Sequence, residues 1–245
     1  MAMTEQPRSA PRTARERARA EITKEILDAG RQHLATDGAT GVSLRAIARD
    51  LGMASSAVYR YIASRDELLT KLIIDAYDSL GAAAETSEAA VDRADLLGRW
   101  TAICTTVRHW AITNPNEYAL IYGSPVPGYV APTDTIGPAS RVSNLLVQLM
   151  ADLAERQPGL ASGPDDDLAP ARWLAALQPV REAFPPQVRT DNIQTGLMVW
   201  SALFGVISFE LFGQFHNVVG ETPGDREAFF AECIRRWATQ LGLTA

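Results

Sequence analysis

The chain has 245 residues, of which 47% are apolar and 21% charged, and its net charge is −6. These values are typical of one or two globular domains with a sizeable core. No apolar run reaches the roughly 18 residues that a membrane span needs, and no apolar segment follows the Arg-rich N-terminus as it would in a secretory signal. We therefore expect a cytoplasmic protein that has no membrane partner.

The charge is distributed unevenly along the chain. Residues 1–80 contain 12 Lys or Arg and 11 Asp or Glu, whereas the remaining residues contain 11 and 18. Positive charge that could face phosphates is therefore concentrated near the N-terminus. Five arginines there form either an arm that contacts DNA or a plain disordered tail: Arg8, Arg12, Arg15, Arg17 and Arg19.

The N-terminal part is predicted to contain four helices after a disordered basic arm, residues 1–14. Apolar residues at helical spacing predict the first helix from residue 15 to Asp37-Gly38. Ser43, Ser55 and Ser64 are good N-caps. They predict two short helices, 44–51 and 55–62, with Gly52 between them, and a fourth helix from 64 to about 83.

The C-terminal part is predicted to be helical as well. The small-residue stretch 82–90 is expected to separate the two parts, and proline-rich or polar loops are expected at 124–138 and 157–164. Further helices are predicted over 92–113, after Asn114-Pro115, over 139–155, from the acidic run 165–167, over 190–214 and over 225–241. With no strand signal, the fold class is all-α, with a three-helix helix-turn-helix domain at 15–64 and a helical ligand-binding and dimerisation domain at 65–245.

The segment 42–69 carries the functional signal. It predicts two short helices joined by a tight turn at residues 52–54, and in this layout the second helix enters the major groove of DNA. The tyrosines could instead pack, and Arg60 could be ordinary surface charge. The predicted DNA contacts are Ser43, Arg45, Ser55, Ser56, Ala57, Tyr59, Arg60 and Tyr61.

The same segment resembles the TetR family of bacterial regulators in Ile47-Ala48, Leu51-Gly52-Met53, Ser55-Ser56, Val58-Tyr59 and the run 64–69. Ile62 stands where the family has an aromatic residue, and Ser56 or Ala57 where it has a glycine. Arg65 stands where the family has a lysine that contacts phosphate, so the resemblance implies the same role. Residues 109–129 and 209–215 resemble the WHG-type subgroup. The resemblance implies an all-helical homodimer, a palindromic double-stranded DNA operator and release by a small-molecule effector.

Two sets of C-terminal residues are candidates for the effector site and the dimer interface. Bulky residues there form either a core or a pocket for an apolar ligand: Trp100, Val107, Tyr118, Tyr122, Trp173, Trp200 and Phe204. The helix 190–214 is apolar on two faces, which predicts a partner subunit on one of them. The predicted dimer contacts are Gly196, Val199, Leu203, Val206, Phe229 and Trp237.

Glu210 interrupts this apolar helix and would be costly if buried without a partner. It could pair with an arginine across the dimer, face solvent or contact a ligand. Cys104 and Cys233 are predicted to be reduced thiols, and no metal or cofactor is predicted.

The favoured hypothesis is a repressor, and three alternatives stay open. A small helical enzyme lacks support, because no catalytic constellation and no phosphate-binding loop is present. A ligand-independent DNA-binding or scaffold protein would lack a cavity in the C-terminal domain. An activator would use the same DNA-binding apparatus.

Overall fold

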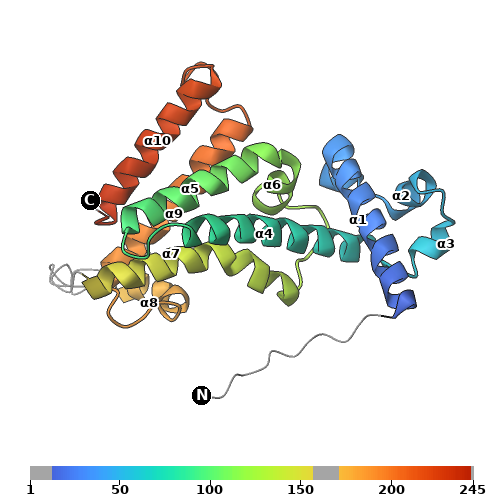
Figure 1. Cartoon of the computed structure of the whole chain (residues 1–245), viewed down its shortest axis with the longest axis horizontal. Helices are drawn as coiled ribbons and strands as arrows, with labels where there is room; N and C mark the ends of the chain where they lie inside the picture. The colour runs from blue at the N-terminus through green and yellow to red at the C-terminus, as the bar shows by residue number, and fades with distance from the viewer. Residues whose placement is uncertain (1–12, 157–170, 244–245) are drawn as a thin grey trace. The chain divides into compact units, whose positions relative to one another are not determined.

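The computed structural model describes residues 13–156 and 171–243, in which every regular element is a helix (Figure 1). The predicted all-α class is confirmed. The loop 157–164 and the acidic run 165–167 lie outside the described residues. The elements are α1 (Ala14–Gly41), α2 (Leu44–Asp50), α3 (Ser55–Val58), α4 (Arg65–Ala89), α5 (Leu96–Thr113), α6 (Pro115–Tyr122), the 3₁₀ turn η1 (Thr133–Thr135), α7 (Ile136–Arg156), α8 (Ala171–Arg181), α9 (Thr190–Leu211) and α10 (Pro223–Gln240).

The chain divides into two compact units. Unit 1 comprises residues 1–72 and 125–130, and unit 2 comprises 73–124 and 131–245. Unit 1 extends beyond the expected boundary at residue 64 because the first turns of α4 pack on α1. A Cβ atom added to Gly30 of α1 would lie 3.3 Å from the side chain of Leu68 and 3.4 Å from that of Leu72.

Several element boundaries differ from the sequence prediction, and the largest differences are at the end of α4 and the start of α5. The small-residue stretch 82–90 does not separate the two parts but continues α4 to Ala89, because alanine is the strongest helix former. Gly81 in this helix lies against α7, since a Cβ atom there would come within 2.7 Å of Arg141. Helix α5 begins at Leu96 rather than Asp92, and the Asp95 side chain caps it by accepting a hydrogen bond from Gly98 N at 2.7 Å.

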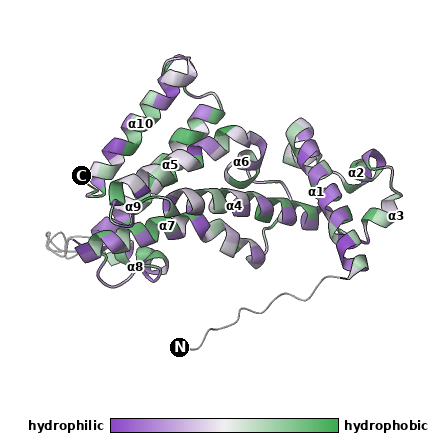
Figure 2. Cartoon of the chain, in the orientation of Figure 1, coloured by the Kyte–Doolittle hydropathy of each residue, from purple (hydrophilic) through white to green (hydrophobic). Residues whose placement is uncertain are grey.

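The core of unit 2 forms around α5, which packs against α6, α7, α9 and α10. Two of its buried aromatic residues donate hydrogen bonds to backbone carbonyls. Trp100 Nε1 donates to Ile234 O at 2.9 Å, and the Tyr118 hydroxyl donates to Phe204 O at 3.1 Å. Helix α10 shows alternating hydrophilic and hydrophobic bands (Figure 2), and it turns Phe230, Ile234 and Ala238 into the core.

Helix α9 is the one helix in the described part of the chain that is long and apolar enough to cross a membrane, by length and composition alone. Core helices pass the same test. Within unit 2, α9 buries Ile193, Leu203 and Ile207 and packs against α5, α6 and α10.

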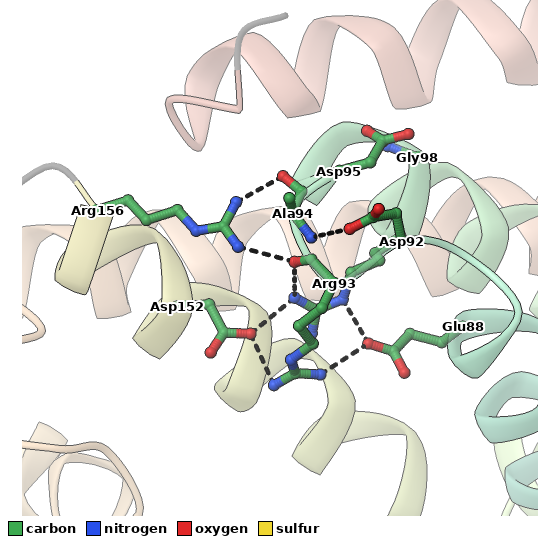
Figure 3. Close-up of polar contacts among 9 residues, drawn as sticks. Glu88, Asp92, Arg93, Ala94, Asp95, Gly98, Asp152 and Arg156 are labelled. Carbon is green, nitrogen blue, oxygen red and sulfur yellow. Dashed lines mark hydrogen bonds and ion pairs between the residues drawn. The ribbon is translucent and has the colours of Figure 1, made fainter.

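A buried ion-pair network joins the end of α4, the start of α5 and the end of α7 (Figure 3). Arg99, whose side chain is 0% exposed, pairs with Glu88 at 2.5 Å and with Asp152 at 2.7 Å. Arg93 bridges the same two carboxylates, at 3.3 and 2.7 Å. Arg156 donates to two backbone carbonyls of the α4–α5 connection, at 2.5 and 2.9 Å. Removing one partner would leave a buried charge uncompensated.

Glu210 is paired, but within its own chain and not across a dimer as one of the alternatives proposed. Its carboxylate accepts two hydrogen bonds from Arg108 of the same chain, at 2.7 and 2.6 Å, so its partner lies on α5. The guanidinium carbon of Arg108 lies 5.3 Å from the centroid of the Phe230 ring. The cysteines Cys104 and Cys233 are free thiols, as predicted.

Candidate nucleic-acid interface and ligand cavity

The two helices of the helix-turn-helix are held together by a small apolar core in unit 1. Ile47 of α2 and Val58 of α3 are fully buried, and Ile62 after α3 is buried with them. Ile62 therefore fills the position where the resemblance led us to expect an aromatic side chain. Burial of these side chains fixes which face of α3 stays exposed.

The turn between α2 and α3 depends on Gly52. Its φ of +64° lies in the left-handed region, which side chains other than glycine rarely adopt. Gly52 N donates to Arg49 O at 3.1 Å, and Met53 N donates to Ala48 O at 2.8 Å. These two bonds form a Schellman motif, which ends α2 and sets the angle at which α3 departs.

Most of the predicted DNA contacts lie on exposed positions of this unit. Arg45, Ser55, Ser56, Tyr59 and Arg60 are exposed. The remaining four predicted contacts are half-buried: Ser43, Ala57, Tyr61 and Arg65.

The predicted serine caps have two outcomes. Ser64 caps α4, because its hydroxyl accepts a hydrogen bond from Glu67 N at 3.0 Å. Ser43 is the N-cap residue of α2, as predicted, but its side chain makes no capping hydrogen bond. The prediction for Ser55 was wrong, because the N-cap of α3 is Ala54. The hydroxyls of Ser43 and Ser55 are therefore not used to cap these helices.

Arg19 of α1 contacts the turn that follows α3, and the sequence pattern did not predict this contact. Its Nη2 donates to Arg60 O at 3.1 Å, and its guanidinium lies 5.3 Å from the centroid of the Tyr61 ring. Arg15 and Arg17 also lie on α1, which starts with a capping box between Thr13 and Glu16. Within the predicted arm, Thr13 and Ala14 therefore belong to this helix start, while Arg8 and Arg12 lie outside the described residues.

Arg65 is occupied by backbone carbonyls of the α1–α2 connection. Its Nε donates to Val42 O at 3.1 Å, and its Nη2 donates to Ala39 O at 2.8 Å and to Thr40 O at 3.4 Å. The guanidinium thus ties the start of α4 to the segment before α2. This contact gives Arg65 a structural role in addition to the phosphate contact that the resemblance implies.

Unit 2 contains a cavity of about 330 Å³ bounded by α5, α7, α8 and α9. Trp100 and Trp200, two of the residues predicted to line a ligand site, line this cavity, and Trp100 is fully buried. Gly196 and Val199, which were predicted to lie in a dimer interface, also line this cavity. A Cβ atom at Gly196 would lie 2.8 Å from Met150 Sδ, so α7 and α9 approach closely at this point.

The other predicted ligand residues do not line the cavity. Tyr118, Tyr122 and Phe204 pack on one another, with ring centroids 5.1 Å apart for the tyrosine pair and 4.3 Å for Tyr122 and Phe204. Burial raises the pKa of Tyr118 to about 12. Val107 is buried in the same core. Trp173 is 38% exposed, and its Nε1 donates to Gln194 Oε1 at 3.3 Å.

The residues predicted for the dimer interface are mostly buried or half-buried within unit 2 of the same chain. Leu203 is fully buried in the core of the same chain, and Val206, Phe229 and Trp237 are half-buried. The exposed apolar residues of α9 and its C-cap form a different face, which includes Met198, Phe209 and Phe212.

The fold of unit 1 and its exposed basic, hydroxyl-bearing face define a DNA-binding regulator of the helix-turn-helix class. A family profile described as "Bacterial regulatory proteins, tetR family" matches residues 26–72, and one described as "Tetracyclin repressor-like, C-terminal domain" matches residues 100–237. The chain belongs to the TetR family of transcriptional regulators. It is a DNA-binding regulator and not an enzyme.

Relatives and solved structures agree with this assignment. An HTH-type transcriptional regulator of Mycobacterium tuberculosis (strain ATCC 25618 / H37Rv) is 43% identical over 215 residues, which cover 84% of this chain and 88% of that protein. A regulator of Mycobacterium bovis has the same identity and coverage. The crystal structure of a regulatory protein, SCO4313, is 31% identical, with a TM-score of 0.72 over 93% of this chain and all of that one. The TetR-family regulator PfmR of Thermus thermophilus shares the fold, at 17% identity and a TM-score of 0.55, over 86% of this chain and 97% of that one.

Proposed function

We propose that this TetR-family regulator is a cytoplasmic, homodimeric repressor that binds a palindromic operator and leaves it when a small, largely apolar ligand binds unit 2. The proposal that a ligand binds unit 2 rests on the cavity of about 330 Å³ that Trp100 and Trp200 line. It falls within the range of volumes typical of small-molecule sites. The ligand shifts the protein away from its DNA-binding state only by the difference in its affinity for the two states.

The exposed side of α3 supports the proposed operator contacts. Ser55, Ser56, Tyr59 and Arg60 lie exposed on or beside α3, and Arg45 lies exposed on α2. We propose that these residues, with Ser43, Ala57, Tyr61 and Arg65 at the edges, face the DNA. Serine, tyrosine and arginine side chains supply the phosphate contacts that position such a helix in the major groove.

The exposed face of α9 supports the proposed homodimer. Met198, Ala202, Gly205, Phe209 and Phe212 follow one another at spacings of four, three, four and three residues, and Met198 and Phe209 are 65% and 52% exposed. Such a seven-residue spacing places an apolar stripe along one side of a helix. The small residues in its middle let two helices approach closely. A second copy of the chain, presenting the same face, would cover this stripe.

Sedimentation equilibrium tests the homodimer. Phe209→Glu should convert a dimer to a monomer, because it places a carboxylate in the centre of the apolar interface. Ile112→Glu, at an exposed apolar position of α5 outside the stripe, is the matched control and should leave the dimer intact. An unchanged dimer in the Phe209 variant would exclude this face.

In vitro transcription tests the sign of regulation. The template carries the promoter that precedes the gene for this chain, and purified full-length protein is added in increasing amounts. A repressor lowers the transcript level in proportion to operator occupancy, and the variant with Tyr59→Ala and Arg60→Ala should not. A rise in transcript level would show an activator instead.

A further inference from the structure

The walls of the cavity in unit 2 carry information about the chemistry of the ligand. Among the described residues that line it, none has an ionisable side chain. The apolar walls come from α5, α7, α8 and α9. The polar lining side chains are Ser140, Ser143 and Asn144, which lie together on the first turns of α7. Asn144 is exposed, so this polar wall lies at the mouth of the cavity.

Three arginines are adjacent in sequence to residues that line the cavity, and each makes ion pairs or hydrogen bonds with other groups. Arg141, between the two serines, pairs with Asp78 at 2.8 Å and with Glu85 at 2.5 Å. Arg99, next to Trp100, lies in the buried network described above. Arg181, next to Val180, donates to two backbone carbonyls at 3.2 and 3.1 Å. A ligand carboxylate or phosphate in the cavity would therefore have no cation to pair with.

The serine hydroxyls at the mouth favour a donor on the ligand. Ser140 Oγ donates to Ile136 O at 2.5 Å, and Ser143 Oγ donates to Ser140 O at 2.9 Å. A hydroxyl whose proton is already used offers only its lone pairs. Trp100 Nε1 is also used, because it donates to Ile234 O. An ionised carboxylate, which only accepts, would find no donor in either serine, and of the three polar side chains at the mouth only the amide of Asn144 could donate to it.

We infer that the ligand of this cavity is an uncharged molecule with an apolar body and one small polar end that can donate a hydrogen bond, such as an alcohol. The apolar body lies against Trp100, Trp200 and Leu197, and the polar end meets Ser140, Ser143 and Asn144. This inference rests on the proposed function of unit 2 as the effector-binding domain. Fatty-acid anions and phosphorylated molecules should therefore bind this site less tightly than an uncharged molecule of the same length.

Isothermal titration of the full-length protein with three probes of equal chain length tests the inference. The probes are 1-octanol, octanoate and octylammonium at pH 7.5. Octanol should bind at least about 10-fold more tightly than either ion, because burying an unpaired charge is costly. Octanoate or octylammonium binding as tightly as octanol would overturn the inference.

Variants place the binding in the cavity. Gly196→Leu fills the cavity and should abolish octanol binding, whereas Gly137→Leu, on α7 where a Cβ atom would meet nothing within 4 Å, should retain it. Asn144→Lys supplies an ammonium group at the mouth, and it should tighten octanoate binding about 10-fold while leaving octanol unchanged. An octanoate affinity that Asn144→Lys does not change, or octanol binding that survives Gly196→Leu, would contradict the assignment.

A measurement of operator binding distinguishes a failure of the inferred ligand class from a failure of the proposed function. Operator affinity is measured without any probe and does not depend on the cavity. A chain that binds its operator but none of the three probes would overturn the inferred ligand class and leave the DNA-binding regulator intact. A chain that binds octanol selectively but has no effect on transcription would support the ligand class and overturn the proposed repressor.

Discussion

Replacing Arg65 distinguishes its structural role from a phosphate contact. In Arg65→Ala, the carbonyls of Val42 and Ala39 lose hydrogen bonds of 3.1 and 2.8 Å, and Thr40 O loses a weaker one. A hydrogen bond to a charged group contributes about 1.5–3 kcal/mol, and less at a half-exposed position, so the loss should be about 2–3 kcal/mol. Arg65→Lys keeps the charge, but its single ammonium cannot reproduce the fork, and we expect a loss of about 1–2 kcal/mol.

Differential scanning calorimetry and operator titration, made on the same samples, test this reasoning. One kcal/mol corresponds to roughly 4–8 °C in Tm for a domain of the size of unit 1, so Arg65→Lys should melt several degrees lower. It should bind DNA nearly normally at 10 °C, where unit 1 is still folded. Arg45→Lys, at an exposed position of α2, is the control and should melt as the native protein does. An Arg65→Lys variant with an unchanged Tm, or an Arg65→Ala variant with an unchanged Tm and lost DNA affinity, would refute the structural role.

Three further predictions concern unit 2. Glu88→Ala leaves the buried guanidinium of Arg99 with one carboxylate fewer, and urea unfolding should show a loss of about 3 kcal/mol; a loss below 1 kcal/mol would contradict the network. Hydrogen bonding to Arg141 lowers the pKa of Glu85, so this pair contributes stability above pH 4.5 and loses it as the pH falls. Glu85→Gln should therefore be destabilising by up to about 1 kcal/mol at pH 7 and neutral at pH 3; an equal effect at both values would exclude the ion pair. Tyr118→Phe removes one buried hydroxyl and should cost about 1 kcal/mol in the same urea assay; an unchanged midpoint would show that this hydroxyl contributes nothing to stability.

The helix-turn-helix could be predicted from the sequence because its determinants are local. Gly52 needs a left-handed conformation, and Ile47 and Val58 occupy buried positions set by helical spacing. These features act over a few residues, so the order of residues along the chain is enough to place them. The same is true of Gly38, where the first helix was predicted to stop: its φ of +68° is not helical and interrupts α1 before Gly41.

The contacts of Arg19 and Arg65 could not be predicted in this way. Arg19 reaches a carbonyl 41 residues away, and Arg65 reaches carbonyls 23 to 26 residues away. Only the packing of the helices brings these groups together. A long side chain that can serve either the backbone or a phosphate carries no sequence signal that distinguishes the two roles.

The assignment of the faces of α9 shows a second limit. Val199 and Leu203 are as apolar as Met198 and Phe209, and the sequence pattern therefore allowed either pair to face a partner. Which face is covered depends on how α5, α7 and α10 cross α9, and the structure buries Val199 and Leu203. The sequence pattern also did not distinguish aromatic residues that line a cavity from those that fill a core. Tyr118, Tyr122 and Phe204 pack on one another in the core and do not line the ligand cavity.

Fluorescence anisotropy tests whether the exposed face of α2 and α3 reads DNA. Labelled DNA that flanks the gene for this chain is titrated with full-length protein at two salt concentrations, beside a scrambled duplex and the variant with Tyr59→Ala and Arg60→Ala. The expected result is tight binding that is selective for the native duplex, falls steeply with salt and is lost in the variant. Equal affinity for the scrambled duplex, or an unchanged affinity of a folded variant, would contradict it.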